Sequence, residues 1–514
     1  MKTMLAKLFR ALSATALTLA LPGLAQAPPP EARELQAALA LQDPAAKVKE
    51  LERLQAAYPA SPLKPVLEGQ LRSIRISLAA TLDEVLTLQQ ADLRGATGAQ
   101  RVTGPGVAAR QLLEHPKVAS FDKAKVLAVV QGYRDQARQA AADPAVLAAT
   151  EERTREYLPA MAGDVDIFLA RAQALAGDAP KALGTLNAFV KAEGIPSGAY
   201  FLARAVVLEA LGRPKEAEAA LLDAALENHP EGLRRAKEAF LKRTGKEEGF
   251  EAVLDAKRKE LPFHPAPVKA GPAWKGKAVL AELFTGSECP PCVAADLAFD
   301  GLLESHAPTT LVVLEYHLPI PGPDPMMNPA TRKRQEYYGV NSTPTMFFDG
   351  QDKLTGGGGR ARSEAKYKQA AAVVAKRGET APGASLQLKT LRKADLVEAT
   401  FSLGKAIAGV DYHLVLVQPQ QEHKGGNKVL VHKMVVRDLL TLDPAATSAS
   451  FDLAASEKAA DAHLTELEKA NPRFKGFQFP VRRSAISREG LKVALFAQER
   501  ATRQVLQVVL AEVK

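Results

Sequence analysis

Cysteine, tryptophan and long apolar stretches are all scarce in this chain of 514 residues. Its two cysteines exclude a scaffold held together by several disulfides. Aromatic residues make up 5% of the chain, so its cores must rely on leucine, valine and alanine. The hydrophobic and charged fractions, 46% and 24%, are nevertheless typical of globular proteins. They exclude a wholly disordered chain, and the length suggests about three domains.

Dense runs of basic residues are missing as well. The formal net charge is +9, from 67 basic and 58 acidic residues. Residues 1–27 hold three of the basic residues and no acid, which leaves 64 basic against 58 acidic residues in the rest of the chain. That excess is weak, and no basic stretch carries interleaved aromatic residues. We therefore expect no nucleic-acid partner.

The first 27 residues have the pattern of a secretory signal peptide. A basic stretch (1–10) precedes an apolar stretch (11–21), and residues 25–27 (Ala-Gln-Ala) have the form of a cleavage site. The apolar stretch is shorter than the roughly 20 residues that span a bilayer, and no later segment is apolar enough to do so. A buried N-terminal helix is the alternative. The pattern predicts a periplasmic or secreted protein of the bacterial cell envelope, with no membrane span.

Residues 28–261 are rich in alanine, leucine, glutamate, lysine and arginine, which are strong helix formers. The segment 168–172 (Phe-Leu-Ala-Arg-Ala) recurs as residues 201–205, and a glycine turn follows each copy, at Gly177 and at Gly212. A helix, a glycine turn and a second helix at a period of 33 to 35 residues resemble the tetratricopeptide repeat. The resemblance implies an α-helical domain whose surface binds a partner peptide. An alanine-rich helical bundle is the alternative.

Two further domains are expected after a linker. Residues 262–273 contain four prolines and should form an extended, semi-rigid connection. Residues 274–380 alternate between buried strands and helices in the order βαβαββα, which predicts a small α/β sheet domain. Residues 381–514 contain about seven short alternating strands and one helix, a pattern typical of an antiparallel β-sandwich. The whole chain is therefore expected to be a multidomain α+β protein.

Both cysteines stand in one motif, Cys289-Pro290-Pro291-Cys292, which follows an expected strand and begins an expected helix. The free N–H groups and the positive end of the helix dipole favour a thiolate on Cys289, and Cys292 lies one turn further on. The motif therefore predicts a redox-active pair in which Cys289 attacks and Cys292 resolves. Three alternatives remain: a zinc site, which lacks two further ligands, a structural disulfide, which gains little from so short a loop, and inert packing thiols. No metal or organic cofactor is expected.

A second motif, residues 341–345 (Asn-Ser-Thr-Pro-Thr), opens a later strand. The two motifs, in this order and on these elements, resemble those of the thioredoxin family, and the resemblance covers residues 274–378. It implies a thioredoxin fold, a cis peptide bond between Thr343 and Pro344, and a substrate strand held by the backbone of Thr343. It also implies a thiol–disulfide oxidoreductase whose substrates are proteins with thiols or disulfides.

Two features of this chain concern acids near the pair. The family usually has tryptophan before its first cysteine, where this chain has Ser287-Glu288. The carboxylate of Glu288 should raise the pKa of the Cys289 thiol and place the pair toward the reducing end of the family. The alternative is that Glu288 points into water and the prolines set the potential. Glu282 is the candidate for the family's buried acid that assists proton transfer, although its position along the strand differs by one residue from that of the family's acid. The alternative is a half-buried glutamate at a strand end with no such role.

Three further features have competing interpretations. The insertion 319–328, after the second strand, either forms a lip beside the pair or is an inert surface loop. The glycines at 356–359 lack the lysine of a phosphate-binding loop, so a flexible connection is expected there. His413, His423 and His432 either meet as a metal site or, as we expect, are solvated or packed against a sheet.

These patterns predict an exported thiol–disulfide oxidoreductase that leans toward reduction of its substrates. The alternative is an envelope protein-binding scaffold, built from the helical repeats and the sandwich, in which the redox pair is vestigial. Reduction of an insulin-like disulfide by the purified protein with dithiothreitol separates the two.

Overall fold

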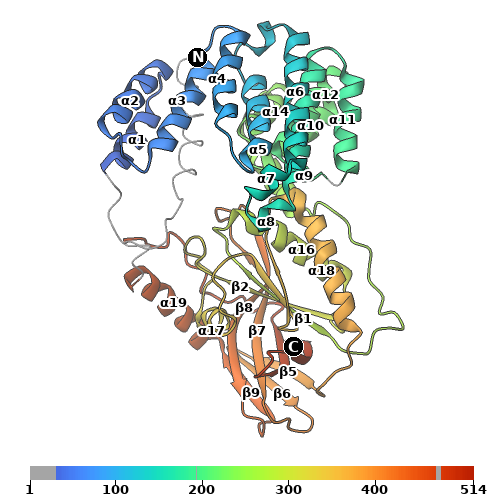
Figure 1. Ribbon diagram of the computed structural model, residues 1–514. Coiled ribbons are helices and arrows are strands. Elements are labelled where there is room, and N and C mark those ends of the chain that lie inside the picture. The colour runs from blue at the N-terminus through green and yellow to red at the C-terminus, as the bar shows by residue number, and fades with distance from the viewer. Residues whose placement is uncertain (1–29, 193, 471–475) are drawn as a thin grey trace. The chain divides into compact units, whose positions relative to one another are not determined.

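The computed structural model describes residues 30–192, 194–470 and 476–514 of the chain (Figure 1). It divides into two compact units, of which the first extends to Lys246 and the second begins at Glu247. The expected signal peptide, residues 1–27, lies outside the described residues. Within the described ranges, no helix is both long enough and apolar enough to cross a membrane.

The first unit is built from helices, as the sequence predicted. They are α1 (Pro30–Ala40), α2 (Pro44–Ala57), α3 (Lys64–Leu78), α4 (Leu82–Arg94), α5 (Gln100–Leu113), α6 (Lys123–Ala142), α7 (Pro144–Ala148), α8 (Glu152–Arg155), α9 (Leu158–Gly163), α10 (Val165–Leu175), α11 (Ala179–Lys191), α12 (Gly198–Ala210), α13 (Pro214–Leu226) and α14 (Pro230–Thr244). Asp43, Thr81 and Asp122 cap α2, α4 and α6 by accepting backbone N–H groups of the first turn. A buried cluster dominated by leucine, valine and alanine joins α3 to α10.

The internal repeat corresponds to two successive helix pairs, α10 with α11 and α12 with α13. Gly177 and Gly212 stand in the turns of these pairs with φ angles of +92° and +70°, which glycine adopts without strain. Ala170, Ala182 and Ala203 are completely buried in the cluster that these helices share. Their small side chains let the neighbouring helices approach closely.

The second unit begins with α15 (Phe250–Lys259) and then combines strands with helices. Its strands are β1 (Val279–Thr285), β2 (Leu311–His317), β3 (Thr345–Phe348), β4 (Asp352–Thr355), β5 (Gln387–Lys393), β6 (Leu396–Ser402), β7 (Val410–Glu422), β8 (Val431–Leu442), β9 (Ser448–Asp452), β10 (Lys492–Glu499) and β11 (Val505–Glu512). Its other helices are α16 (Val293–Ser305), α17 (Pro329–Tyr338), α18 (Ser363–Gly378) and α19 (Leu453–Ala470). The multidomain α+β class expected from the sequence is confirmed at this level.

Eight of the strands form one mixed sheet in the order β11-β10-β7-β8-β2-β1-β3-β4. β1 and β2 run parallel, and every residue in both is buried, as in central strands that are covered on both faces. Side chains alternate between the faces of a strand, so Glu282 of β1 contacts Arg334 on α17, whereas Thr285 of β1 contacts Asp296 on α16. The helices α16 and α17 therefore cover opposite faces of β1.

The strands expected to form a separate sandwich divide between two sheets. β7, β8, β10 and β11 extend the sheet of β1 to β4 through a parallel contact between Glu315 of β2 and Val435 of β8. β5, β6 and β9 form a second sheet, and a shared apolar cluster that includes Val397 and Leu414 packs the two sheets together. The sheets face each other as in a sandwich, but the boundary expected at residue 380 falls within one continuous fold. Alternating hydrophobicity shows which face of a strand is buried and not which strand lies beside it, so this pairing was not predictable.

The proline-rich linker is anchored on the second unit. Phe263 is buried, and its ring centre lies 5.2 Å from that of Tyr367 on α18. The N–H of Val268 donates to the carbonyl of Ser305 at 2.7 Å. The helix α15, which precedes the linker, belongs to the same unit. The segment 262–273 therefore follows the surface of this unit and is not a free spacer.

Candidate functional site

The cysteine pair lies where β1 leads into α16. Residues 286–288 connect the strand to Cys289, and Pro290 and Pro291 occupy the short 3-10 turn that precedes the helix. The two sulfur atoms form a disulfide of 2.06 Å, with the Cα atoms of Cys289 and Cys292 5.3 Å apart. Proline fits this first turn because its missing N–H would have had no helical partner there. The motif therefore has the position that the sequence predicted.

Both cysteines are completely buried, with 0% of their surface accessible to solvent. The hydroxyl of Thr343 lies 3.3 Å from the sulfur of Cys289 and donates a hydrogen bond to the carbonyl of Ile320 at 2.7 Å. Ile320 belongs to the insertion 319–328, so one end of the insertion lies next to Thr343, beside the pair.

The bond between Thr343 and Pro344 is cis, as predicted. A second cis bond, between Ile320 and Pro321, was not foreseen. The structure thus brings Thr343 to the cysteine pair through its side chain. That Thr343 and Pro344 hold a substrate strand stays a prediction.

The glycines at 356–359 pack against the motif. The N–H of Gly358 donates to the carbonyl of Pro291 at 2.7 Å, and the carbonyl of Gly358 accepts from the N–H of Ala294 at 3.0 Å. A Cβ atom at Gly357 would stand 1.8 Å from the Pro291 oxygen, so a larger residue requires movement of the backbone. The expectation of a flexible connection is therefore wrong, since this segment supports the first turn of α16. The sequence does not distinguish glycine that gives freedom from glycine that permits close approach.

A loop between β7 and β8, residues 424–428, holds the turn that precedes Cys289. The backbone N–H of Asn427 donates to the carbonyl of Ser287 at 2.8 Å, and its side-chain amide donates to the carbonyl of Gly286 at 3.2 Å. This loop lies in the part of the chain that was assigned to the sandwich. Residues from both halves of the continuous sheet therefore position the redox motif.

Glu288 is half-buried and turned toward the same loop. One of its carboxylate oxygens accepts the N–H of Gly426 at 3.1 Å. A Cβ atom at Gly322, in the insertion, would stand 3.2 Å from the Cβ of Glu288, so the two segments lie close together. Glu288 therefore has a protein partner and does not simply point into water. Its effect on the thiol of Cys289 stays a prediction.

Glu282 is fully buried, as a tuning acid would be, but it has other partners. Its carboxylate accepts hydrogen bonds from the guanidinium of Arg334 at 2.7 and 2.8 Å and from the hydroxyl of Tyr338 at 2.6 Å. Among the described residues, no hydrogen bond or ion pair joins Glu282 to Cys289 or Cys292. A shift of one residue along a strand places a side chain on the opposite face of the sheet, and Glu282 accordingly faces α17. The geometry gives no support to its proposed role.

The buried acid on the cysteine side of β1 is Asp296, one helical turn after Cys292. It is 4% exposed, accepts the hydroxyl of Thr285 at 2.5 Å and lies 3.5 Å from the side-chain amide of Asn427. Burial raises the pKa of Asp296 to about 7, although the hydrogen bond from Thr285 and the charge of His317 oppose this rise. A carboxyl group with such a pKa exchanges a proton near neutral pH. The missed signal in the sequence was an acid four residues after Cys292 in an apolar helix.

A carboxylate and an imidazole lie beneath the same turn. Asp324, in the insertion, accepts the backbone N–H of Ser287 at 2.6 Å and that of Met326 at 2.8 Å, and it contacts Nδ1 of His317 at 3.0 Å. Burial opposes its ionisation, but the charge of His317 and these hydrogen bonds hold the pKa of Asp324 well below its ordinary value. Asp324 therefore attaches the insertion to the turn before Cys289, a link that no spacing in the sequence predicts.

The three histidines considered as a metal site do not converge. His413 contacts Thr441 in the sheet, whereas His432 packs against His317 with 4.9 Å between the ring centres and contacts the carbonyl of His423 at 3.1 Å. Burial lowers the pKa of His413 and of His432 to about 3, so both rings are neutral. Across the described ranges, no group of three or more histidine, cysteine or acidic side chains is placed to hold a metal ion.

The arrangement offers one kind of chemistry. Once reduced, Cys289 and Cys292 form a vicinal dithiol that can exchange with another disulfide. Asp296 lies one turn away and can take up or release a proton, and one end of the insertion lies beside Thr343. No protein-family model, curated protein or solved structure matches the chain.

Proposed function

We propose that the chain is an exported thiol–disulfide oxidoreductase of the thioredoxin type that works through Cys289 and Cys292. The observation that carries the proposal is that the only two cysteines of the sequence are joined at the start of α16, beside the hydroxyl of Thr343. The strand order β2-β1-β3-β4, with β1 parallel to β2 and antiparallel to β3, supports a thioredoxin fold for this region. A disulfide is compatible with an oxidising compartment outside the cytoplasm, which agrees with the export pattern of residues 1–27.

The reaction begins with the reduced protein. The thiolate of Cys289 attacks one sulfur of a substrate disulfide, which forms a mixed disulfide and releases the second substrate sulfur as a thiolate. The thiolate of Cys292 then attacks the sulfur of Cys289, restores the internal disulfide and releases the remaining substrate thiolate. Two electrons pass from the dithiol to the substrate, and the two substrate thiolates take up the protons that the cysteines lost. A thiol reductant then regenerates the dithiol.

Proton transfer at Cys292 is assigned to Asp296. This acid lies one turn after Cys292, and its pKa of about 7 makes its carboxylate a suitable acceptor for the thiol proton. Asp296 thus takes the role that the sequence had suggested for Glu282. It serves as a general base for the resolving thiol and does not contact the substrate.

Access to Cys289 requires movement of the insertion 319–328. The Ile320 end is attached through a hydrogen bond to the half-buried Thr343, whereas Asp324 contacts two buried groups outside the insertion, the N–H of Ser287 and the ring of His317. We therefore expect the Ile320 end to open and the Asp324 end to stay in place. The substrate strand would then take the place of Ile320 beside Thr343.

The test is reduction of insulin by the full-length protein with dithiothreitol, followed by trapping of mixed disulfides. Cys292→Ala should leave a substrate bound to Cys289, whereas Cys289→Ala should trap little. A reduction rate no higher than that of dithiothreitol alone would refute the enzymatic proposal. Equal trapping by the two variants would refute the assignment of their roles.

A scaffold with a vestigial pair is the second candidate, and the burial of both cysteines favours it. In that case the helix pairs of the first unit, which resemble tetratricopeptide repeats, would bind a partner peptide while the disulfide only closes the turn. Resistance of the disulfide to dithiothreitol in the folded protein would support this candidate. Rapid reduction without unfolding would support the oxidoreductase.

A further inference from the structure

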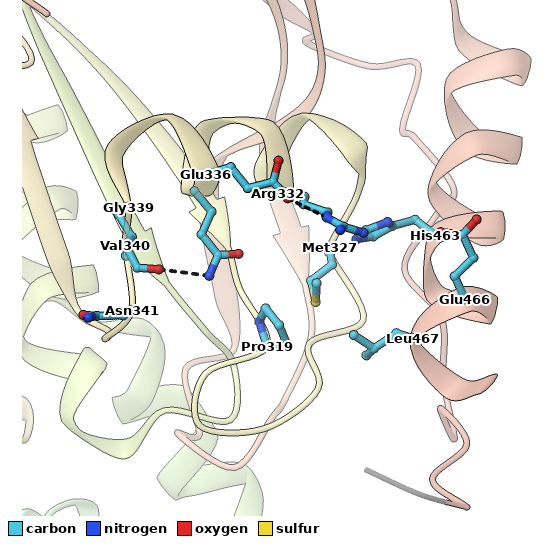
Figure 2. Close-up of a pocket in the computed structure, with 11 residues that line it drawn as sticks. Pro319, Met327, Arg332, Glu336, Gly339, Val340, Asn341, His463, Glu466 and Leu467 are labelled. Carbon is cyan, nitrogen blue, oxygen red and sulfur yellow. Dashed lines mark hydrogen bonds and ion pairs between the residues drawn. The ribbon is translucent and has the colours of Figure 1, made fainter. Parts of the chain in front are cut away.

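A cavity of about 760 Å³ lies between α17, α19 and the two ends of the insertion 319–328 (Figure 2). Its apolar lining comes from Pro319, Met327, Val340 and Leu467. Met327 and Val340 are buried, and Pro319 and Leu467 are half-buried. Ligand pockets commonly have about 300 to 1,000 Å³, so this cavity has room for a large side chain and its backbone.

The cavity adjoins the segments that cover Cys289. Pro319 immediately precedes Ile320, whose carbonyl accepts the hydroxyl of Thr343. Asn341, which also lines the cavity, lies two residues before Thr343. An extended strand advances about 3.3 Å per residue, so a substrate strand at Thr343 reaches the cavity within about two or three residues.

One polar side chain in the wall is buried and unsatisfied. His463, on α19, is 8% exposed, and its Nε2 atom has no hydrogen-bond partner among the described residues. Burial lowers the pKa of His463, so its imidazole is neutral near pH 7. Figure 2 shows its ring reaching from α19 toward Arg332 on α17. Nε2 has almost no accessible surface, so a ligand reaches it only when the side chains around it shift. An unpaired buried polar atom is costly, so a ligand that brings a hydrogen-bonding group to it is favoured.

The charged side chains at the rim have mixed signs. Arg332 pairs with Glu336 at 2.9 Å on α17, and Glu466 stands on α19 (Figure 2). Because Arg332 is paired with Glu336, the net charge of the rim is that of Glu466, which opposes an anionic ligand. The apolar residues of the lining oppose the burial of a cation. The lining therefore favours a neutral occupant with an apolar body and a polar tip.

We propose that this cavity is a substrate subsite for a tyrosine that lies about two or three residues from the reacting cysteine of the substrate polypeptide. The ring occupies the apolar space between Met327, Val340 and Leu467, and the hydroxyl pairs with Nε2 of His463. A phenol suits this place because it both donates and accepts, and a buried tyrosine hydroxyl usually has a partner. The inference rests on the proposed function, since it needs Cys289 as the reacting group.

The test uses peptides that share one disulfide and differ at a single position near the cysteine. The full-length protein is assayed with tyrosine, phenylalanine, alanine, glutamate or lysine at that position, and with hydroxyethyl disulfide as a substrate that cannot fill the cavity. We expect kcat/KM for the tyrosine peptide to exceed that for the phenylalanine peptide about 2- to 10-fold, the worth of one hydrogen bond. It should exceed that for the alanine peptide about tenfold or more, mainly through KM, because the ring is no longer buried.

Three variants assign the preference to its residues. His463→Leu should remove the advantage of tyrosine over phenylalanine and keep that of phenylalanine over alanine. Leu467→Ser should reduce the advantage of phenylalanine over alanine. Glu466→Gln, on the rim, is the matched control and should change neither preference. All three should reduce hydroxyethyl disulfide as fast as the native sequence does.

The outcomes for the subsite and for the proposed function are distinct. Reduction of hydroxyethyl disulfide with equal kcat/KM for all five peptides, or with a preference for glutamate or lysine, overturns the subsite and leaves the proposed function intact. Reduction of neither the small disulfide nor any peptide refutes the proposed function, and the subsite falls with it. Should His463→Leu fail to fold, the preferences of the native sequence and of Leu467→Ser still decide.

Discussion

At the scale of single residues, the redox motif depends on polar contacts from several segments that are distant in sequence. Asn427 holds the carbonyl of Ser287, Asp324 holds its N–H, and the hydroxyl of Thr343 reaches the sulfur of Cys289. Each contact fixes one group of the backbone or one sulfur atom, so substitutions here should act on reactivity as well as on stability. Asp296 and Glu288 carry the most specific consequences, because each places a carboxyl group near the cysteines.

Asp296→Asn should make the second unit more stable than the native sequence at pH 8. Burial raises the pKa of Asp296 to about 7 in the folded protein, against about 4 in an unfolded chain. Between these two pKa values the folded state keeps a proton that the unfolded state releases. The protonated Asp296 therefore makes its full contribution to the free energy of unfolding below about pH 4, and this contribution is lost as the pH rises to about 7. At pH 8 the buried carboxylate costs up to about 4 kcal/mol, which asparagine avoids.

Urea unfolding at pH 8 and at pH 4 measures this difference. Trp274 is the only tryptophan and belongs to the second unit, so its fluorescence follows that unit. The midpoints of Asp296→Asn and of the native sequence should differ at pH 8 and converge at pH 4. Glu304→Gln, which replaces an exposed acid of the second unit, is the control. Equal midpoints at pH 8 would contradict the raised pKa of Asp296.

Glu288→Gln tests whether charge sets the redox potential. The amide oxygen of glutamine can still accept the N–H of Gly426, so the substitution removes the charge and keeps this contact. Without the carboxylate, the thiolate of Cys289 should be more stable, its pKa lower and the potential of the pair less negative. For the native sequence we expect a potential between about −200 and −270 mV.

Equilibration with glutathione gives both potentials. Glu304→Gln, an exposed acid near the other end of α16, is the matched control and should leave the potential unchanged. An unchanged potential in Glu288→Gln would mean that Pro290 and Pro291, and not Glu288, set the redox potential of the pair. A native potential near the roughly −120 mV of a strong oxidant would contradict the lean toward reduction.

At the scale of helices and strands, the sequence predicted the type and order of elements, which depend on local patterns. The order βαβαββα expected for residues 274–380 is present as β1, α16, β2, α17, β3, β4 and α18, because buried runs and N-terminal prolines mark such elements. The contact of β2 with β8 and the docking of residues 356–359 onto α16 were not predictable. Both depend on tertiary contacts between segments that no periodicity connects.

Gly357→Ala should weaken the support of the first turn of α16. The added Cβ atom would stand 1.8 Å from the oxygen of Pro291, so the segment must move away and the hydrogen bond of Gly358 to Pro291 is lost. We expect a loss of about 1 to 3 kcal/mol in the free energy of unfolding and faster reduction of the disulfide by dithiothreitol. Urea unfolding through Trp274 and a thiol-release assay measure the two effects.

Gly271→Ala is the control for that substitution, since nothing lies within 4 Å of its added Cβ atom. It should leave both the midpoint and the rate of reduction unchanged. If Gly357→Ala behaves like Gly271→Ala, the segment 356–359 yields without cost and has no supporting role.

At the scale of the whole molecule, composition and periodicity separated a helical half from a half with sheets, and the two compact units of the structure meet between Lys246 and Glu247. The helical run appeared to continue to residue 261, yet α15 belongs to the second unit. An amphipathic helix shows that it has a buried face and not which core buries it. The same reasoning explains why the continuous sheet of the second unit was taken for two domains.

We predict that residues 247–514 fold alone and keep the disulfide chemistry. The described residues separate into two compact units at this boundary, so each part of the chain is expected to fold around its own contacts. Trp274 fluorescence should give the same urea midpoint for this fragment as for the full chain. Residues 30–246 alone should be helical and, without cysteine, inactive toward disulfides.

A shorter fragment, residues 262–514, separates the boundary at 247 from the one expected at 261. It lacks α15, whose Glu251 and Asp255 form ion pairs with Lys424 in the loop between β7 and β8. Loss of these ion pairs, each worth up to about 1 kcal/mol, should make this fragment unfold at a lower urea concentration than residues 247–514. Equal midpoints for the two fragments would show that α15 adds nothing to the second unit and would restore the boundary at 261. A lower midpoint for residues 247–514 than for the full chain would instead mean that the units stabilise each other.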